Sequence, residues 1–316
     1  MSTYSDKLKI FAGNSHPALA EDICEYLGTE LLDARAKRFA DGEVTVEINE
    51  TVRGADVFII QPTSPPVNEN IMELLVIVDA LRRASARRIT AVVPYYGYAR
   101  QDRKAKPRDP ITAKLMANIL TAAGARRLLS IDLHAPQIQG FFDIPVDNLY
   151  AAPLMVDYFR KKELSDLTAV APDVGSVKRV RSIAETLNIP MSIIDKRRPK
   201  ANVAEVMHVI GRSNIQDSNV ILFDDIIDTG GTITQAAEAL KENGAKKVFA
   251  CASHGLFSDP ALERLEKSSI DEVIVTDSIP QKHSDGLDNL TVLSLAPLVG
   301  EAIDRIFKDL SVSVLF

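Results

Sequence analysis

The chain alternates short apolar runs with longer segments in which apolar residues recur every three or four positions. The short, β-rich runs lie at residues 9–12, 57–60, 89–93, 128–131, 169–171, 220–223, 248–252 and 273–275. The longer segments lie at residues 71–83, 111–123, 176–187 and 232–243. Buried strands separated by helices are typical of βαβ units, which build a parallel sheet. The alternation therefore predicts an α/β fold, with a mostly parallel sheet flanked by helices.

The two halves of the chain share a pattern that indicates duplication. Residues 54–60 align with 217–223, residues 85–92 with 243–250 after a one-residue shift, and residues 152–154 with 296–298. Chance coincidence of short apolar strings is the alternative explanation. We favour a duplicated domain whose copies meet between residues 146 and 147. The first copy is longer, mainly at residues 61–70 and 95–110, and long loops in compact domains often carry function.

Composition excludes several classes of protein. Hydrophobic residues make up 46% and charged residues 25% of the chain, which is ordinary for a globular protein. Cys24 and Cys251 are too few for a disulfide framework or a cysteine metal cluster. Residues 1–9 are polar and no apolar run approaches the roughly 20 residues of a membrane span, so we expect a cytoplasmic protein. A net charge of -6 argues against general nucleic-acid binding.

A glycine-rich turn between a predicted strand and a predicted helix is the most informative stretch. It consists of Asp228, Thr229, Gly230, Gly231 and Thr232. Glycines permit unusual backbone conformations, and the N-terminus of the following helix favours an anion, so the turn could hold a phosphate monoester. Asp224 and Asp225 end the strand, where carboxylates can accept hydrogen bonds from sugar hydroxyls. A helix cap with a tight turn is the plain structural alternative.

Six further motifs occur in order along the chain. They lie at residues 39–43, 94–104, 131–142, 171–175, 195–200 and 253–257. The sequence of the glycine-rich turn resembles the ribose-phosphate signature of phosphoribosyltransferases and synthases. Together with this turn, the six motifs resemble the class I ribose-phosphate pyrophosphokinases over nearly the entire chain. The resemblance implies two duplicated phosphoribosyltransferase-like domains. Residues 1–146 would contribute to ATP binding and residues 147–316 would bind ribose 5-phosphate.

The activity that this resemblance implies is the transfer of diphosphate from ATP to the C1 hydroxyl of ribose 5-phosphate. Phosphoribosyl pyrophosphate and AMP are its products, and Mg²⁺ is its cofactor. Charge neutralisation and positioning catalyse transfers of this type. Lys196 and Arg198 match the catalytic residues of the family's flexible loop, whereas the residues alone favour a solvated charge run. Arg197 and Lys200 are weaker candidates.

The resemblance also assigns magnesium-associated residues. His134 matches a residue that associates with the metal and approaches ATP, and Asp173 matches the second metal residue. From the residues alone, a structural role for a lone histidine at a strand end is favoured, because Mg²⁺ prefers oxygen ligands. The chain departs from the family at Ser176, where a second glycine is usual. We expect Ser176 to cap the following helix rather than to strain the turn.

The resemblance places ATP contacts in the first half. Phe39, Asp41 and Glu43 match adenine-binding elements, and Arg100 and Gln101 match further ATP contacts. The structural alternatives are a β-turn between two strands and a solvated basic loop. In the family the first motif reaches a neighbouring subunit, so we expect a homo-oligomer that is at least a dimer. The resemblance implies a hexamer built from dimers.

The C-terminal segment resembles a regulatory ending of the family. Ser311 and Ser313 would contribute to a site for inorganic phosphate and ADP. The family commonly has tyrosine or a polar residue in place of Val314, which makes the ADP part less expected than the phosphate part. An apolar, alternating tail that pairs as a final edge strand is the alternative.

Two competing functions remain open on the sequence. A phosphoribosyltransferase would use the glycine-rich turn but not the ATP motifs. A catalytically silent regulatory subunit would retain the fold and bind active homologues, and the intact Lys196, Arg198 and His134 argue against it.

Overall fold

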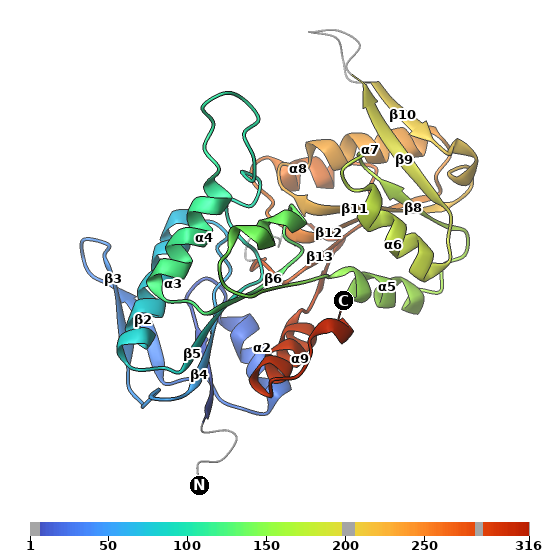
Figure 1. The fold of residues 1–316 in the computed structure, drawn as a ribbon. Coiled ribbons are helices and arrows are strands. Elements are labelled where there is room, and N and C mark those ends of the chain that lie inside the picture. The colour runs from blue at the N-terminus through green and yellow to red at the C-terminus, as the bar shows by residue number, and fades with distance from the viewer. Residues whose placement is uncertain (1–6, 198–205, 282–286, 316) are drawn as a thin grey trace. The chain divides into compact units, whose positions relative to one another are not determined.

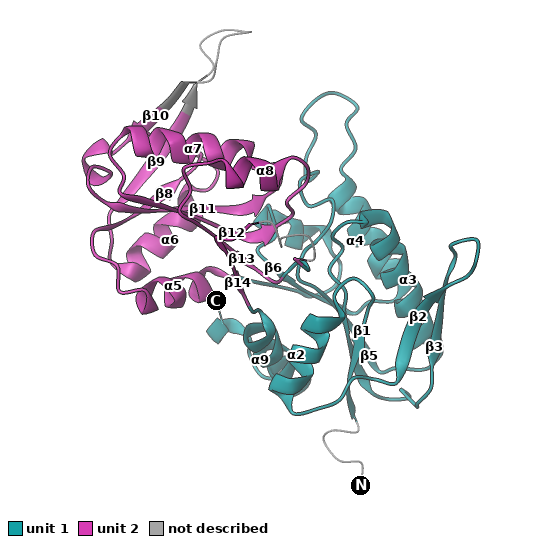
Figure 2. Ribbon diagram, turned by 180° about the vertical axis from the view of Figure 1, so that it is seen from behind, with its two compact units in different colours: residues 1–150, 278–280, 294–316 teal, residues 151–277, 281–293 magenta. Residues whose placement is uncertain are grey.

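The computed structural model describes residues 7–197, 206–281 and 287–315, which form two compact units (Figure 2). The first unit comprises Met1–Tyr150, Ser278–Pro280 and Ser294–Phe316, and the second comprises Ala151–Asp277 and Gln281–Leu293. Each unit is built on a sheet flanked by helices (Figure 1), as the alternation in the sequence predicts. Among the described residues, no helix combines the length and the apolar character needed to cross a membrane.

The first unit contains a five-stranded parallel sheet in the order β1-β4-β5-β6-β7. Its strands are β1 (Leu8–Ala12), β4 (Asp56–Ile60), β5 (Arg88–Val93), β6 (Arg127–Ile131) and β7 (Val146–Leu149). The helices of this unit are α2 (Pro17–Leu27), α3 (Val67–Arg83), α4 (Thr112–Ala123), η1 (Pro136–Phe141), α9 (Ala296–Phe307) and η3 (Ser313–Leu315). Every residue of β4 is buried, which explains its continuous apolar run, because helices cover both faces of a parallel sheet.

The second unit contains a seven-stranded sheet in the order β10-β9-β8-β11-β12-β13-β14. Its strands are β8 (Leu167–Ala171), β9 (Met191–Arg197), β10 (Val206–Ile210), β11 (Asn219–Ile227), β12 (Lys247–Gly255), β13 (Glu272–Thr276) and β14 (Leu290–Leu293). Among the described strands of this sheet, β10 and β9 pair antiparallel and the other pairs are parallel. The helices are α5 (Ala152–Lys161), α6 (Val177–Leu187), α7 (Gly231–Glu242), α8 (Ala261–Glu266) and the 3-10 turn η2 (Arg212–Asn214).

The two units repeat one topology. The order β8-β11-β12-β13-β14 in the second sheet has the same connectivity as β1-β4-β5-β6-β7 in the first. An antiparallel pair of strands, β2 (Ala34–Arg38) and β3 (Val44–Ile48), follows α2 just as β9 and β10 follow α6. The predicted duplication therefore holds at the level of strand order, which chance similarity of short apolar strings does not explain.

The last helix of each sequence half belongs to the other unit. Helix α5 follows β7 but packs against α6 in the second unit, and α9 follows β14 but packs against α2 in the first. The sequence predicts domains of 1–146 and 147–316, whereas the compact units divide the chain after Tyr150 and include residues 294–316 in the first unit. The amphipathic pattern of a helix predicts that one face is buried but does not identify its partner.

Candidate functional site

The glycine-rich turn connects β11 to α7 in the second unit. Gly230 stands at the N-cap of α7 with φ of 74°, a left-handed conformation in which a side chain would be strained. Its carbonyl accepts a hydrogen bond from the backbone N–H of Thr234 at 3.0 Å, which begins the helix. Glycine has no side chain that could accept the first-turn N–H groups of α7, so these donors face the turn as an anion site requires. Thr229 and Thr232, at either end of the glycine pair, are exposed.

Two adjacent carboxylates lie in β11, upstream of this turn. Asp225 is buried, and Nη1 of Arg179 in α6 lies 3.6 Å from its Oδ1. Burial, reinforced by the charges of Asp225 and Asp173, raises the pKa of Asp224 to about 8. Asp173 follows β8, the neighbour of β11 in the sheet, so three acids lie near the same sheet edge. This edge can receive a cation or hydroxyl donors.

We expect the acidic pair to destabilise the ligand-free protein as the pH rises. The unfolded pKa of an aspartate is about 3.9. Because the folded pKa of Asp224 is higher, the unfolded state releases a proton that the folded state retains between pH 4 and 8. The free energy of unfolding therefore falls by up to about 1.4 kcal/mol per pH unit across this window.

Denaturant unfolding without divalent cations measures this slope. Asp224→Asn should have a shallower pH dependence than the wild type, and the matched control Asp217→Asn, at an exposed position, should not. Equal slopes for the wild type and Asp224→Asn would contradict the assignment.

The turn after β8 positions Asp173 without strain. Ser176 has φ of -84°, and its backbone N–H donates to Oδ1 of Asp173 at 2.9 Å. Its hydroxyl donates to the backbone carbonyl of Asp173 at 3.0 Å. The expected cap is corrected in part: Ser176 occupies the N-cap position of α6, but its side chain does not accept a hydrogen bond from the helix. A serine therefore fits here because the position does not require positive φ.

In the first unit, the loops after β5 and β6 are joined by a hydrogen bond. Nε2 of Gln137 in η1 donates to Oδ2 of Asp102 at 3.1 Å. Arg100 and Gln101 precede Asp102, and His134 lies just before η1; all three are exposed. The carboxyl ends of neighbouring parallel strands share one sheet edge, where ligands of open α/β sheets bind. The structure thus gathers the loops that carry these three predicted residues.

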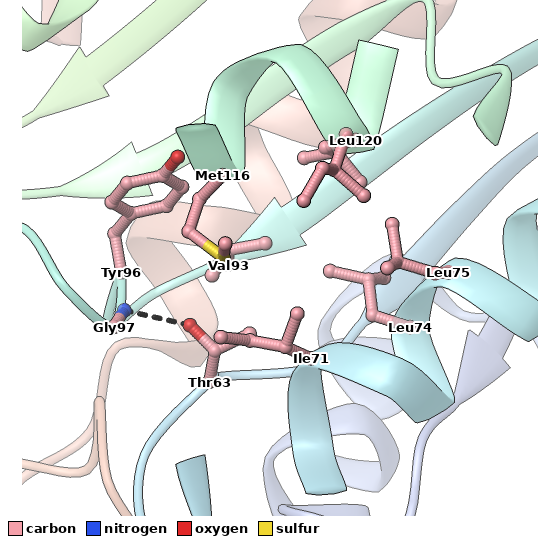
Figure 3. A pocket seen from close by; sticks show the side chains of 10 residues that line it. Thr63, Ile71, Leu74, Leu75, Val93, Tyr96, Gly97, Met116 and Leu120 are labelled. Atoms are coloured by element: carbon pink, nitrogen blue, oxygen red, sulfur yellow. Dashed lines mark hydrogen bonds between the residues drawn. The ribbon is translucent and has the colours of Figure 1, made fainter. Parts of the chain in front are cut away.

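Two residues that the sequence analysis did not single out hold the base of the first loop. The backbone N–H of Gly97 donates to Oγ1 of Thr63 at 2.7 Å, above a small apolar cleft between α3 and α4 (Figure 3). A Cβ at Gly97 would lie 2.6 Å from the carbonyl oxygen of Thr63, so only glycine fits. The requirement for glycine at position 97 comes from its tertiary neighbour Thr63. In the sequence, the signal for it is a single glycine between two tyrosines.

The predicted adenine-binding residues lie at the tip of the β2–β3 hairpin. The backbone N–H of Phe39 donates to the carbonyl of Glu43 at 2.9 Å, and the backbone N–H of Glu43 donates to Oδ1 of Asp41 at 3.0 Å. The backbone N–H of Gly42 also donates to the carbonyl of Phe39 at 3.0 Å, so the β-turn alternative is correct as a description of the backbone, with the turn at residues 39–42. The side chain of Phe39 is nevertheless exposed, 58% for the residue, which leaves its aromatic face accessible.

Comparison with known proteins supplies the family. The model for the N-terminal domain of ribose phosphate pyrophosphokinase matches residues 8–124, and the phosphoribosyl synthetase-associated domain matches residues 161–316. The ribose-phosphate pyrophosphokinase of Caldanaerobacter subterraneus subsp. tengcongensis is 58% identical over 317 residues, covering 100% of both chains. The chain belongs to the ribose-phosphate pyrophosphokinase family. The resemblance seen in its motifs is thereby confirmed.

Other ribose-phosphate pyrophosphokinases agree with this assignment. The Thermotoga maritima enzyme of that name is 57% identical over 317 residues, which are 99% of each chain. The crystal structure of phosphoribosylpyrophosphate synthetase from Mycobacterium smegmatis matches with a TM-score of 0.90 and 43% identity, covering 96% of this chain and 99% of that one. The expected α/β fold of duplicated domains is confirmed.

Lys196, the first of the two predicted catalytic residues, lies near the end of β9. The backbone of Lys196 pairs with Met207 of β10 in antiparallel register. Arg198 lies outside the described residues. Their catalytic role remains a prediction based on the family resemblance.

The C-terminal segment of the pyrophosphokinase is not an edge strand. Residues 313–315 form the 3-10 turn η3, so that alternative is wrong. Oγ of Ser311 lies 3.0 Å from Oγ of Ser313, and Nη1 of Arg305 donates to the carbonyl of Ser311 at 3.2 Å. Val314 is 67% exposed. The two predicted serines thus lie together at the surface.

The acidic edge of the second unit fits Mg²⁺ bound with few protein ligands. Within residues 7–197, 206–281 and 287–315, no three His, Cys, Asp or Glu side chains are arranged to hold a metal ion. Mg²⁺ often takes one or two carboxylates, with waters and substrate phosphates completing its shell. Asp173 offers an exposed carboxylate, and burial together with the charges of Asp225 and Asp173 raises the pKa of Asp224, which a cation bound at this edge would lower again.

Proposed function

We propose that this chain transfers the diphosphate group of ATP to the C1 hydroxyl of ribose 5-phosphate, producing phosphoribosyl pyrophosphate and AMP. The observation that carries the proposal is the match of both family domains together with full-length relatives named ribose-phosphate pyrophosphokinase. A phosphoribosyltransferase or a silent regulatory subunit is not favoured, because named pyrophosphokinases align over the whole chain.

The second unit would bind ribose 5-phosphate. The left-handed Gly230 and the first-turn N–H groups of α7 form a cradle for the 5-phosphate, to which the exposed Thr229 and Thr232 add hydroxyls. Asp224 and Asp225 would accept hydrogen bonds from the ribose hydroxyls. Arg179, 3.6 Å from Asp225, would keep that carboxylate oriented. Asp228 completes the turn.

The first unit would supply the ATP contacts. Arg100, Gln101 and His134 lie on loops at one sheet edge, where the guanidinium of Arg100 can pair with phosphate oxygens. The exposed ring of Phe39 would stack on adenine, while Asp41 and Glu43 accept from its amino group.

The reaction requires neutralisation of charge on the migrating diphosphate. The oxygen of the C1 hydroxyl attacks the β-phosphorus and releases its proton to water. The bond from the β-phosphorus to the oxygen that bridges it to the α-phosphate breaks, and AMP leaves with that oxygen. Asp173 and His134, the two metal residues that the family resemblance assigns, would hold Mg²⁺, which would supply positive charge to the phosphate oxygens. Lys196 and Arg198 would pair with the oxygens of the transferred group as their charge develops.

One assay tests this proposal. The protein is incubated with ATP, Mg²⁺ and ribose 5-phosphate, and the nucleotide product is identified by chromatography. AMP formed together with phosphoribosyl pyrophosphate supports the transfer. ADP as the product, or consumption of phosphoribosyl pyrophosphate with a free base, would contradict it.

Asp228→Ala and Thr232→Ala should weaken ribose 5-phosphate binding in particular. Each change removes a polar group from the turn without touching the ATP loops, and a hydrogen bond to a charged group contributes about 1.5–3 kcal/mol. Calorimetric titration should therefore show roughly 10- to 100-fold weaker binding of ribose 5-phosphate. Unchanged affinity for this substrate with altered affinity for ATP would show that the two sites are reversed.

The exposed hairpin tip supports a shared active site in a homo-oligomer, which we expect to be a hexamer built from dimers. Phe39 would then bind adenine in a neighbouring subunit. Mixed oligomers of Phe39→Ala and Lys196→Ala chains, each inactive alone, should regain partial activity, because some sites combine both intact elements. Verified mixed oligomers that recover no activity, or a fully active monomer, would exclude sharing.

We also expect inorganic phosphate and ADP to regulate the enzyme, with Ser311 and Ser313 in the phosphate site. The adjacency of their hydroxyls, 3.0 Å apart, supports the phosphate part of this expectation. The exposed Val314 offers ADP no polar contact from its side chain, so regulation by ADP is the less expected part. A cytoplasmic location fits an enzyme whose substrates are a nucleotide and a sugar phosphate.

A further inference from the structure

Helix α8 lies directly behind the glycine-rich turn. Nη1 of Arg264 donates a hydrogen bond to the backbone carbonyl of Thr229 at 3.0 Å. A Cβ at Gly230 would lie 3.4 Å from the carbonyl oxygen of Ala261, and a Cβ at Gly231 would lie 3.3 Å from Nη1 of Arg264. The guanidinium of Arg264 therefore bonds to the backbone of the turn, and the first residue of α8 leaves little space beside Gly230.

The hydrogen bond from Arg264 determines how one peptide group of the turn is oriented. The carbonyl of Thr229 and the N–H of Gly230 belong to the same peptide plane. In a trans peptide these two groups point in opposite directions. A carbonyl held on the side of α8 therefore directs the N–H of Gly230 away from α8.

We propose that Arg264 is a positioning residue for the 5-phosphate of the sugar substrate. It holds the Thr229–Gly230 peptide so that its N–H is presented to the phosphate, and it does so before the ligand arrives. The inference rests on the proposed function, because it takes the turn to be the ribose 5-phosphate site. The positive charge of Arg264, bonded to the back of the turn, adds electrostatic attraction for a dianion.

The position of Arg264 argues against a role in core stability. Its side chain is exposed, and it bonds to a backbone carbonyl in the turn rather than packing in the core. Lys267, one helical turn further along, is the natural comparison. It is also an exposed cation, and its Nζ lies 2.6 Å from Glu263 within the same segment. The two exposed cations therefore differ in their partners: Arg264 bonds to the glycine-rich turn, and Lys267 pairs with Glu263.

Three variants of Arg264, made in the full-length oligomeric enzyme, separate its hydrogen bond from its charge. Arg264→Ala removes both, Arg264→Lys keeps the charge and one flexible donor, and Arg264→Gln keeps a donor without charge. Calorimetric titration with ribose 5-phosphate and steady-state kinetics give the affinity, the KM values and kcat. Hydrogen exchange of peptides covering residues 224–234 reports the order of the turn in the ligand-free enzyme.

We expect Arg264→Ala to weaken ribose 5-phosphate binding roughly 5- to 10-fold, the loss of about one hydrogen bond. The KM for ATP and kcat at saturating substrate should stay within about twofold of the wild-type values, because substitutions of surface residues usually have effects of this size or smaller. Exchange should accelerate in the turn alone. Arg264→Lys should restore part of the affinity, and Lys267→Ala should match wild type.

The results distinguish failure of this inference from failure of the proposed function. Arg264→Ala could keep wild-type affinity for ribose 5-phosphate and wild-type hydrogen exchange while Thr232→Ala loses affinity for this substrate. That result would overturn the positioning role of Arg264 and leave the proposed function intact. Equal losses for both substrates, or faster exchange throughout the unit, would show a structural role and likewise overturn it. A wild-type enzyme that does not bind ribose 5-phosphate would overturn both.

Discussion

Replacing Lys196 or Arg198 with alanine should lower turnover by on the order of 10²- to 10³-fold each. A cation that pairs with the charge developing on the migrating diphosphate stabilises the transition state more than it stabilises the bound substrate. Its loss therefore lowers kcat and kcat/KM together. Rapid-quench measurement of AMP formation at saturating substrates reports this change directly.

Neighbouring cations provide matched controls for this experiment. Arg197→Ala and Lys200→Ala remove the same kind of charge from the same segment, and we expect them to have much smaller effects on turnover. Binding of ribose 5-phosphate and thermal unfolding should stay near wild type in Lys196→Ala and Arg198→Ala. Near-normal turnover in both of these variants would remove the loop from the mechanism.

Loss of packing by α9 should destabilise the first unit, although this helix lies near the C-terminus of the chain. Ile303 in α9 is fully buried, and the helix packs against α2. Truncation of a buried isoleucine to alanine costs about 2–5 kcal/mol. The whole stability of a domain is about 5–15 kcal/mol, so Ile303→Ala should greatly increase opening of this unit.

Hydrogen exchange can locate this destabilisation. Amides of β1, β4 and β5 in the first unit should lose protection in Ile303→Ala, while those of β11 and β12 should retain more of theirs. The control is Ile210→Ala, the same truncation at a residue that is 56% exposed. Loss of protection confined to the second unit would contradict the assignment of α9 to the first.

The apolar runs in the sequence predict the strands of the two sheets except β7, β9, β10 and β14, because the signal of a buried strand is local. Each of the eight apolar runs lies within a strand. Three of the four periodic segments match a helix to within one residue, and the fourth, 71–83, lies within α3. A parallel sheet covered on both faces needs continuous apolar strands, and its helices need one apolar face, so these patterns are present in the sequence itself.

The short C-terminal segment shows where local patterns fail. Its alternation of serine and apolar residues also fits a strand, but residues 313–315 form a 3-10 turn. The turn is accompanied by a hydrogen bond from Arg305 of α9 to the carbonyl of Ser311, which the alternation of residue types does not encode. Ser176 is similar, since its hydroxyl donates to the carbonyl of Asp173 instead of capping the helix.

The sequence by itself determined the α/β class, the duplication and the motifs that identify the pyrophosphokinase family. These features depend on residue order within short segments, where hydrophobic period and turn chemistry act locally. Only the tertiary structure decided that α9 packs in the first unit and that Arg264 holds the carbonyl of Thr229. The physical reason is that an apolar helix face can pack against many surfaces and a guanidinium can donate to many acceptors. The contact that forms depends on which surfaces the folded chain brings within contact distance.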